Sequence, residues 1–150
     1  KVSVLKKEMQ NCISVAIHVR RGDYVGDGEL DICSMSYYRN AIEYLKKKQS
    51  DLKFYVFSND TEFCKINFFF LNNVVFVDTS KEDKSDYWDM FLMTQVKHLI
   101  IPNSTFSWWG AFLNANPQKI VIVPERYDAY NTYNTSHELY PPEWVKLAVN

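Results

Sequence analysis

Short runs of β-branched and aromatic residues alternate along the chain with longer amphipathic stretches, and this alternation restricts the fold more than any other feature. The runs predict five strands, at 13–19, 52–57, 74–77, 99–101 and 120–123. Helices are expected at 36–48, 61–69, 86–97 and 106–114, followed by a loop over 125–140 and a last helix from Glu143. Strands and helices in strict alternation form a parallel sheet covered on both faces. The sequence therefore predicts an α/β fold, a Rossmann-like three-layer α/β/α domain with a parallel sheet of about five strands.

The length and charge of the chain exclude several broad classes of protein. Its 150 residues suffice for a single domain over 1–150, and 47% hydrophobic residues with a net charge of −1 exclude disorder as the main state. Seventeen Lys and Arg against eighteen Asp and Glu leave no positive field, so no nucleic-acid partner is expected. The sequence has no run of eighteen apolar residues, so no transmembrane segment is expected.

The start of the chain and its cysteines bear on where the protein works. The chain begins with Lys1 rather than Met and lacks the apolar core of a signal peptide, so we expect a piece of a longer protein. Cys12, Cys33 and Cys64 include no C-x-x-C pair, which favours idle thiols in a reducing compartment. We expect a cytoplasmic protein of bacterial type, either free or associated peripherally with a membrane.

A first polar cluster follows the first predicted strand. Alternation along that strand places His18 and Arg20 on one face. Adjacent arginines suit a diphosphate, because guanidinium groups bind phosphate oxygens in bidentate fashion, and Gly22 lets the backbone approach closely. Two alternatives remain open: a solvated ion pair with Asp23, and the integrin-binding tripeptide that Arg21, Gly22 and Asp23 spell.

Two further clusters follow later strands. Ser58, Asn59 and Asp60 can bind sugar hydroxyls or a base edge, or they can cap the next helix, and the two roles are compatible. Asp89 lies in one stretch with Asp86. A carboxylate there can accept from guanine N1–H and the exocyclic amine together, a pair of donors that adenine lacks. The alternative is that both carboxylates favour the helix N-terminus electrostatically.

The fourth cluster stands at the start of a predicted helix that follows a strand. The hydroxyls of Ser104, Thr105 and Ser107 can form a phosphate cradle together with backbone N–H groups. Alternatively, Ser104 or Thr105 is only an N-cap. Trp108 and Trp109 are expected in the core.

Absent motifs narrow the chemistry. The sequence has no P-loop, G-x-G-x-x-G, H-E-x-x-H or G-x-S-x-G. It also has no D-x-D, the usual sequence sign of a metal-chelated nucleotide sugar. A departing diphosphate would be neutralised by arginines and a helix N-terminus, so neither a metal nor another cofactor is expected. His98 opens a strand and is expected to be a satisfied structural residue.

Three segments together resemble one enzyme family. Residues 18–24 (HVRRGDY) are similar to the H-x-R-R-x-D motif of the α1,2-fucosyltransferases. Residues 58–60 resemble the second block of that family and 89–111 its third, in the same order and spacing. The resemblance implies the nucleotide-binding half of a GT-B-type glycosyltransferase. Similar enzymes move L-fucose from GDP-β-L-fucose to the 2-hydroxyl of a galactoside, with inversion and without metal.

The resemblance also implies roles for individual residues. His18 and Arg20 would contact the diphosphate and its ribose, and Arg21 and Asp23 would shape their loop. Arg20 would stabilise the departing β-phosphate, while Asp23 and His18 are the only local candidates for the catalytic base. Asp89 would read guanine. The implied donor-binding set is His18, Arg20, Arg21, Ser58, Asp60, Asp89, Ser104, Thr105 and Ser107.

One family feature has no counterpart in the sequence. The N-terminal half of such enzymes carries a G-x-G-N-Q-type segment, so acceptor recognition is expected outside this chain. Two main hypotheses stay open. The first is the donor domain of a galactoside α1,2-fucosyltransferase, whose partners are GDP-fucose and a galactose-terminated glycan. The second is a module that retains GDP or a GDP-sugar without turnover, and an adhesive domain is a third.

Overall fold

The apolar runs form the strands of one parallel sheet in the computed structural model, which describes residues 1–129 and 139–150. The strands are β1 (Ile13–Val19), β2 (Leu52–Ser58), β3 (Val74–Phe76), β4 (His98–Ile100), β5 (Val121–Pro124) and β6 (Val145–Leu147). Their order is β3-β2-β1-β4-β5-β6, and every neighbouring pair is parallel. The predicted α/β fold with a parallel sheet is confirmed.

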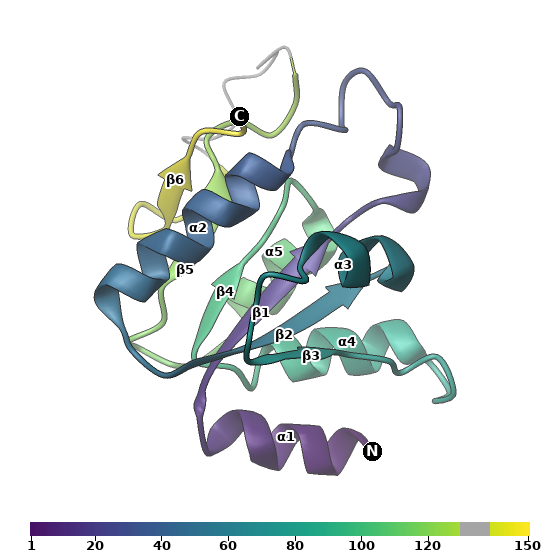
Figure 1. Cartoon of the computed structure of the whole chain (residues 1–150), viewed down its shortest axis with the longest axis vertical. Coiled ribbons are helices and arrows are strands. Elements are labelled where there is room, and N and C mark those ends of the chain that lie inside the picture. Colours follow the sequence, from purple (N-terminus) through teal and green to yellow (C-terminus); the bar gives the residue numbers. More distant parts are fainter. Residues whose placement is uncertain (130–138) are drawn as a thin grey trace.

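Helices cover both faces of this sheet, as Figure 1 shows. They are α1 (Val2–Gln10), α2 (Met35–Lys48), α3 (Thr61–Asn67), α4 (Ser85–Met93) and α5 (Thr105–Phe112), with a short 3-10 helix, η1, at Gly22–Tyr24. Val15 and Ile17 of β1 pack with α2 and α3, whereas Ala16 packs with α1, α4 and α5. Because side chains alternate along a strand, β1 contributes to two separate cores, and the three predicted layers are present.

The C-terminal end of the chain differs from its prediction. The last helix expected from Glu143 is wrong, because Val145–Leu147 forms β6 beside β5. The two prolines before it suit the start of a helix. Instead, this segment satisfies backbone groups at the edge of the sheet, where the N–H of Glu125 donates to the carbonyl of Leu147 over 2.8 Å. The described residues therefore form six strands rather than five.

Other boundaries differ less. Helix α1 covers a segment for which the sequence predicts no element. Helix α4 begins at Ser85, one residue before the expected start at 86, and it follows Lys84, which has a φ of 58°. Residues 130–138 of the predicted loop lie outside the described residues. The structural role of His98 is confirmed, because its buried Nδ1 accepts from the N–H of Ile120 over 3.0 Å.

The order of the strands reverses beside β1. Strands β2 and β3 follow on one side of it, and β4, β5 and β6 follow on the other. The loops that leave the carboxyl ends of β1 and β4 therefore diverge and leave a crevice between them. In open α/β sheets, ligands bind in such a crevice. The loop after β1 meets the entry to α5 there, where the Tyr24 hydroxyl donates to the carbonyl of Asn103 over 3.1 Å.

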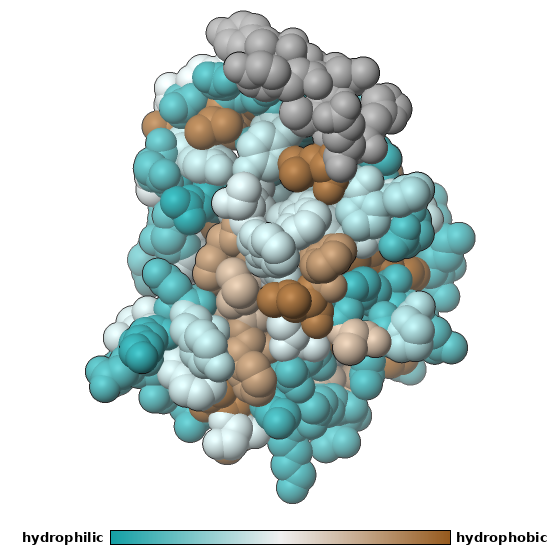
Figure 2. Space-filling view, turned by 180° about the vertical axis from the view of Figure 1, so that it is seen from behind, coloured by the Kyte–Doolittle hydropathy of each residue, from teal (hydrophilic) through white to brown (hydrophobic). Residues whose placement is uncertain are grey.

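The face formed by α1, α4 and α5 carries a band of hydrophobic residues (Figure 2). Phe112 and Leu113 of the α5 end are 51% and 55% exposed. Beside them lies a shallow groove of about 200 Å³, lined by Tyr87, Met90, Phe91, Thr94 and Leu113. Of the helices in the described ranges, none combines the length and apolar character needed to cross a membrane.

Asn114 joins α4 to the end of α5, and its replacement tests that packing. Its buried Nδ2 donates to the carbonyls of Met93 and Val96 over 3.1 and 2.9 Å. Asn114→Ala leaves both carbonyls without this donor, so we expect the free energy of unfolding in urea to fall by about 2 kcal/mol. Gln118→Ala, at an exposed position nearby, serves as the control and should change it by less than about 0.5 kcal/mol. Equal values for the two variants would contradict this account.

Candidate functional site

A cavity of about 110 Å³ opens at the carboxyl ends of β1 and β2, next to the side of β1 on which the strand order reverses. Its lining comes from the ends of these two strands, from the first two turns of α4 and from the first turn of α5. The residues are His18, Arg20, Ser58, Asn59, Asp86, Asp89 and Phe106. Pockets for small molecules usually enclose ~300–1,000 Å³, so this cavity accommodates only part of a nucleotide.

His18 forms the floor of the cavity and is uncharged. Its side chain is buried, and its ring packs on Phe106 with 5.5 Å between centroids. Burial and, to a lesser extent, the nearby charge of Arg20 lower the pKa of His18 to about 3. Among residues 1–129 and 139–150, no hydrogen-bond partner reaches its buried Nδ1. A neutral imidazole with an unpaired nitrogen at a cavity is suited to hydrogen bonding with a ligand.

Arg20 presents a charge at the cavity and is held by its neighbours. Its Nε and Nη2 donate to the two carboxylate oxygens of Asp23 over 3.0 and 3.2 Å, and its Cζ lies 5.3 Å from the Tyr24 ring centroid. These hydrogen bonds lower the pKa of Asp23 and raise that of Arg20. A guanidinium has five N–H donors, so Arg20 keeps donors for an anion while Asp23 fixes its orientation.

Arg21 points to the other side of β1 and is not part of the cavity lining in the described structure. Its Nε donates to Asp60 Oδ2 over 3.2 Å, and its Cζ lies 3.5 Å from the ring centroid of Phe63. Its backbone N–H donates to Asn59 Oδ1 over 2.8 Å. These contacts favour the second role predicted for Arg21, that of shaping the loop. They disfavour the adhesive tripeptide, whose arginine would have to reach another protein.

Ser58 and Asp60 tie the ends of β1 and β2 together. The Ser58 hydroxyl donates to the carbonyl of Val19 over 2.8 Å and accepts from the N–H of Asp60 over 2.9 Å. Asp60 Oδ1 accepts from the N–H of Phe63, which confirms the predicted capping of the next helix. Ser58 reaches the cavity lining, whereas Asp60 lies behind it against Arg21.

Two carboxylates of α4, those of Asp86 and Asp89, line the same cavity as Arg20. Asp89 is half-buried and accepts from the Thr79 hydroxyl over 2.6 Å. Burial, aided by the like charges of Asp86 and Asp78, raises the pKa of Asp89 to about 6, although the hydrogen bond from Thr79 acts in the opposite direction. Asp86, which is exposed, also lines the cavity and is missing from the set that the resemblance implies. Its i, i+3 spacing from Asp89 could have identified it, because such residues share a helix face. No three metal-ligating side chains gather within the described ranges.

The three hydroxyls at the start of α5 do not share one environment. Ser104 precedes the helix as its N-cap and is buried, with no side-chain capping bond in the described structure. Thr105 is exposed, and the buried Ser107 donates to the carbonyl of Ser104 over 3.4 Å. None of the three is among the described residues that line the cavity, which Phe106 reaches instead. The first-turn backbone N–H groups still direct the positive end of the helix dipole towards this region.

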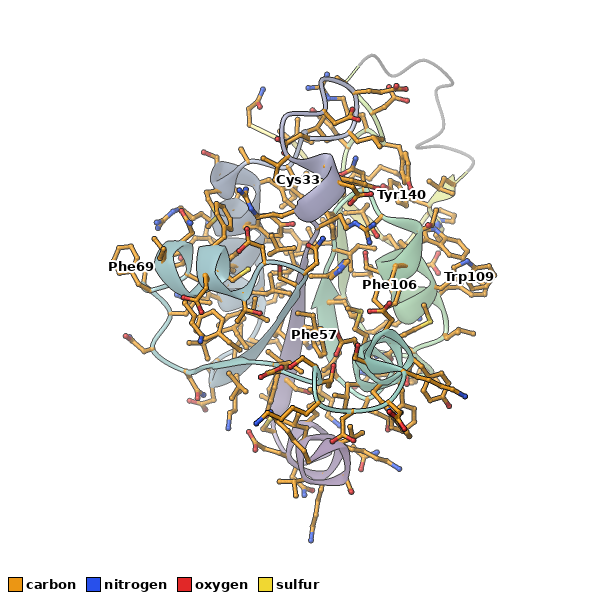
Figure 3. All side chains as sticks on the ribbon, turned by 90° about the vertical axis from the view of Figure 1, so that its right-hand side faces the viewer. Cys33, Phe57, Phe69, Phe106, Trp109 and Tyr140 are labelled. Carbon is orange, nitrogen blue, oxygen red and sulfur yellow. The ribbon has the colours of Figure 1, made fainter. Side chains whose placement is uncertain are left out.

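The two tryptophans of α5 have different surroundings. Figure 3 shows Trp109 pointing away from the molecule, whereas Phe106, earlier on the same helix, points inward. Trp108 is half-buried, and its Nε1 donates to the carbonyl of Leu139 over 2.9 Å. Trp109 is 49% exposed. The prediction that both rings lie in the core is therefore wrong for Trp109, because consecutive helical residues point about 100° apart.

Asn103 joins three segments around the crevice. Its side chain is buried, and its Nδ2 donates to the carbonyls of Leu30 and Tyr127 over 2.9 and 2.8 Å. Its own carbonyl accepts from Tyr24. The loop after β1, the entry to α5 and the segment after β5 are thereby held together. The sequence identifies Asn103 only as part of a polar cluster, and its partners become visible in the fold.

The chain is similar in sequence to several known glycosyltransferases. A family model described as Glycosyl transferase family 11 matches residues 2–148. Alpha-1,2-colitosyltransferase of Escherichia coli is 37% identical, over 94% of this chain and 51% of that protein. The E. coli O-antigen biosynthesis glycosyltransferase WbnK is 35% identical, over 92% and 46%. Human galactoside alpha-(1,2)-fucosyltransferase 1 is 31% identical, over 66% and 28%. The chain thus spans about half the length of these two bacterial relatives.

Solved structures share the fold. NodZ alpha-1,6-fucosyltransferase co-crystallized with GDP superimposes with a TM-score of 0.52 at 16% identity, over 75% of this chain and 39% of that one. A second structure of NodZ, from Bradyrhizobium, has a TM-score of 0.52 at 16% identity, over 75% and 40%. At this level of identity, the likeness concerns the fold alone.

Gly22 sets the turn after β1, and three glycines of that loop test its geometry. Gly22 has a φ of +44°, and a Cβ there would collide with the Asn59 amide nitrogen, which the bond from Arg21 holds in place. We expect Gly22→Ala to lower the free energy of unfolding by about 2 kcal/mol. Gly26→Ala, with a φ of +78° but no collision, should cost about 1 kcal/mol. Gly28→Ala, with neither feature, should be neutral or slightly stabilising in the same urea titration. A different order would contradict this geometry.

Proposed function

The chain belongs to glycosyl transferase family 11, and from this premise we propose that it is the donor-binding part of a galactoside α1,2-fucosyltransferase. The proposed reaction transfers L-fucose from GDP-β-L-fucose to the 2-hydroxyl of a galactose-terminated glycan, with inversion and without a metal ion. One observation carries the proposal: an arginine, a neutral histidine and two carboxylates line one cavity at the carboxyl end of β1, beside which the strand order reverses. This set of side chains suits a ligand that combines a diphosphate with a base bearing paired N–H donors, part of which lies in the cavity.

The diphosphate end of the proposed ligand lies at Arg20. Its guanidinium stays charged at any working pH and is pre-oriented by Asp23. The first turn of α5, next to Phe106, adds backbone N–H groups and the positive end of its dipole. His18, being neutral, would add a hydrogen bond to the phosphate or ribose rather than a charge.

The base end of the proposed ligand lies at Asp89. An ionised carboxylate accepts both guanine N1–H and the exocyclic amine, which gives discrimination against adenine. Two buried hydrogen bonds to a charged group are worth about 1.5–3 kcal/mol each. The Thr79 hydroxyl occupies Oδ1 of Asp89 and thereby fixes the orientation of the carboxylate towards the cavity.

The proposed transfer is a single displacement. The bond from C1 of fucose to the β-phosphate oxygen breaks as the acceptor 2-oxygen bonds to C1 from the opposite face. Negative charge grows on the β-phosphate, where Arg20 and the α5 N–H groups stabilise it. Of the two base candidates, His18 has a pKa near 3 and Asp23 is paired with Arg20. Neither is suited to removing a proton near neutral pH, so we place the base outside both.

Calorimetry with GDP and ADP tests the donor site. We expect GDP to bind at least tenfold more tightly than ADP, and Arg20→Ala to weaken GDP binding at least tenfold, because hydrogen bonds to charged groups are worth about 1.5–3 kcal/mol. Arg39→Ala removes an exposed guanidinium that stacks on Phe70 away from the cavity and should leave binding unchanged. An Arg20→Ala affinity equal to that of the unsubstituted chain would remove Arg20 from the site.

A transfer assay separates the remaining possibilities. Lactose is offered as acceptor with GDP-fucose or GDP-colitose as donor, and the product is identified by mass. Fucosylated lactose supports the proposal. A product formed only with GDP-colitose would show that the transferred sugar is colitose rather than fucose, in line with the name of the E. coli relative. Nucleotide binding without transfer, found also with the full-length protein, favours the module that binds without turnover.

Acidification should weaken donor binding through Asp89. Its pKa in the free protein lies near 6, and only the carboxylate form accepts both guanine donors. The competent fraction falls about tenfold between pH 7 and pH 5, so the Kd of GDP-fucose should rise about tenfold over that range and stay flat above pH 7. GDP-fucose is the chosen probe because its diphosphate is esterified at both ends and does not titrate near pH 6.

Asp89→Asn is the matched variant for the pH dependence, because it keeps the shape of Asp89 and does not titrate. We expect weaker binding of GDP-fucose at pH 7 and a nearly constant Kd between pH 5 and pH 7. A tenfold pH effect that persists in Asp89→Asn would assign the titration to another group and would remove Asp89 from the guanine contact.

A further inference from the structure

Phe63 carries no reactive group and lies outside the cavity, yet its ring supports the loop that bears Arg20. We propose that Phe63 is a positioning residue of the donor site, acting through Arg21. This inference rests on the proposed function, since it concerns how the arginine of the same site is held. It also adds a residue that neither the polar clusters nor the family motifs of the sequence indicate.

Phe63, Asp60 and Arg21 form a closed set of contacts. The Cζ of Arg21 lies 3.5 Å from the centroid of the Phe63 ring. Asp60 contacts both of the others: its Oδ2 accepts from Arg21 Nε over 3.2 Å, and its Oδ1 accepts from the N–H of Phe63 over 3.1 Å. The Asp60 carboxylate thus has two roles. It caps α3 by accepting from the N–H of Phe63, and it orients the Arg21 guanidinium on the Phe63 ring. Three contacts that share their partners hold Arg21 more firmly than any one alone.

Hydrogen bonds also fix the backbone of Arg21. The position of Arg21 therefore affects the position of its neighbour, Arg20. The N–H of Arg21 donates to Asn59 Oδ1 over 2.8 Å, and its carbonyl accepts from the N–H of Tyr24 over 2.7 Å. That second bond closes η1, which contains Asp23. Asp23 then holds the Arg20 guanidinium through two hydrogen bonds. A shift of Arg21 would therefore move both the backbone next to Arg20 and the carboxylate that orients it.

The aromatic character of Phe63 is the property that the inference requires. The ring is half-buried at the surface end of the α2–α3 core, so an apolar side chain of similar size would satisfy its packing. A guanidinium on a ring face is attracted by the negative face of the π-system, which leucine lacks. A purely structural residue would tolerate leucine as well as tyrosine, whereas a positioning residue would tolerate only the second aromatic ring.

The closing experiment compares Phe63→Leu with Phe63→Tyr by calorimetry with GDP. We expect Phe63→Leu to weaken GDP binding about fivefold, the ratio that corresponds to a cation–π contact of ~1 kcal/mol, and Phe63→Tyr to restore it to within about twofold. Phe69→Leu replaces a phenylalanine that is 76% exposed beyond the end of α3 and should leave binding unchanged. Equal GDP affinities for Phe63→Leu and Phe63→Tyr would overturn the inference.

A double-mutant cycle tests the route through Arg21. If Phe63 acts through Arg21, then Phe63→Leu adds nothing to the loss of GDP affinity caused by Arg21→Ala. Additive losses would mean that the two side chains act independently, which would overturn the proposal. The ratio of affinities is the readout, and thermal unfolding of each variant verifies that it is folded.

Amide hydrogen exchange in the nucleotide-free chain keeps this inference distinguishable from the proposed function. Phe63→Leu should speed exchange of the Arg21 and Tyr24 amides, which donate to Asn59 and to the Arg21 carbonyl, and Phe63→Tyr should not. Failure of the unsubstituted chain to bind GDP would overturn the proposed function, while exchange would still decide whether Phe63 fixes the loop. Unchanged exchange in Phe63→Leu would show that it does not.

Discussion

The parallel pairing of β1 with both β2 and β4 is the constraint on which the candidate site depends. Strand β1 is central, and the chain adds strands on one side of it before turning to the other. The carboxyl end of β1 therefore stands at the crevice between diverging loops. The register places His18 opposite Phe57 and Val19 opposite Ser58, so the polar residues that follow β1 and β2 leave the sheet at the same level. Cavity residues from four elements meet there because this pairing is fixed.

Much of this arrangement could be predicted from the sequence, for identifiable reasons. Strands β1 and β2 are rich in β-branched and aromatic residues, as is typical of buried parallel strands. The capping role of Asp60 is local, because its acceptor and donor are three residues apart. Strand β6 was not predictable in this way: three residues carry almost no periodicity, and their pairing with β5 depends on the rest of the sheet.

The candidate site was predicted less completely, because its contacts join distant parts of the chain. Arg21 and Asp60 are 39 residues apart in sequence, and no local pattern indicates that they pair. The three hydroxyls near α5 were grouped by their spacing, whereas the fold buries two of them and exposes the third. Trp109 was assigned to the core by its chemical type, although its place on α5 turns it outward. In each case the residue type was informative and its direction was set by tertiary structure.

The two adjacent arginines, Arg20 and Arg21, have different roles because their side chains point to different sides of the sheet. Arg20 and Arg21 directly follow β1, and their side chains continue its alternation by pointing to different sides of the sheet. Arg20 faces the cavity, and its charge is oriented by one exposed carboxylate that leaves donors available. Arg21 faces α3, where a second carboxylate and an aromatic ring occupy its guanidinium. A pair of arginines at a strand end therefore does not imply two phosphate contacts. Here the geometry assigns one guanidinium to the cavity and the other to the loop that holds it.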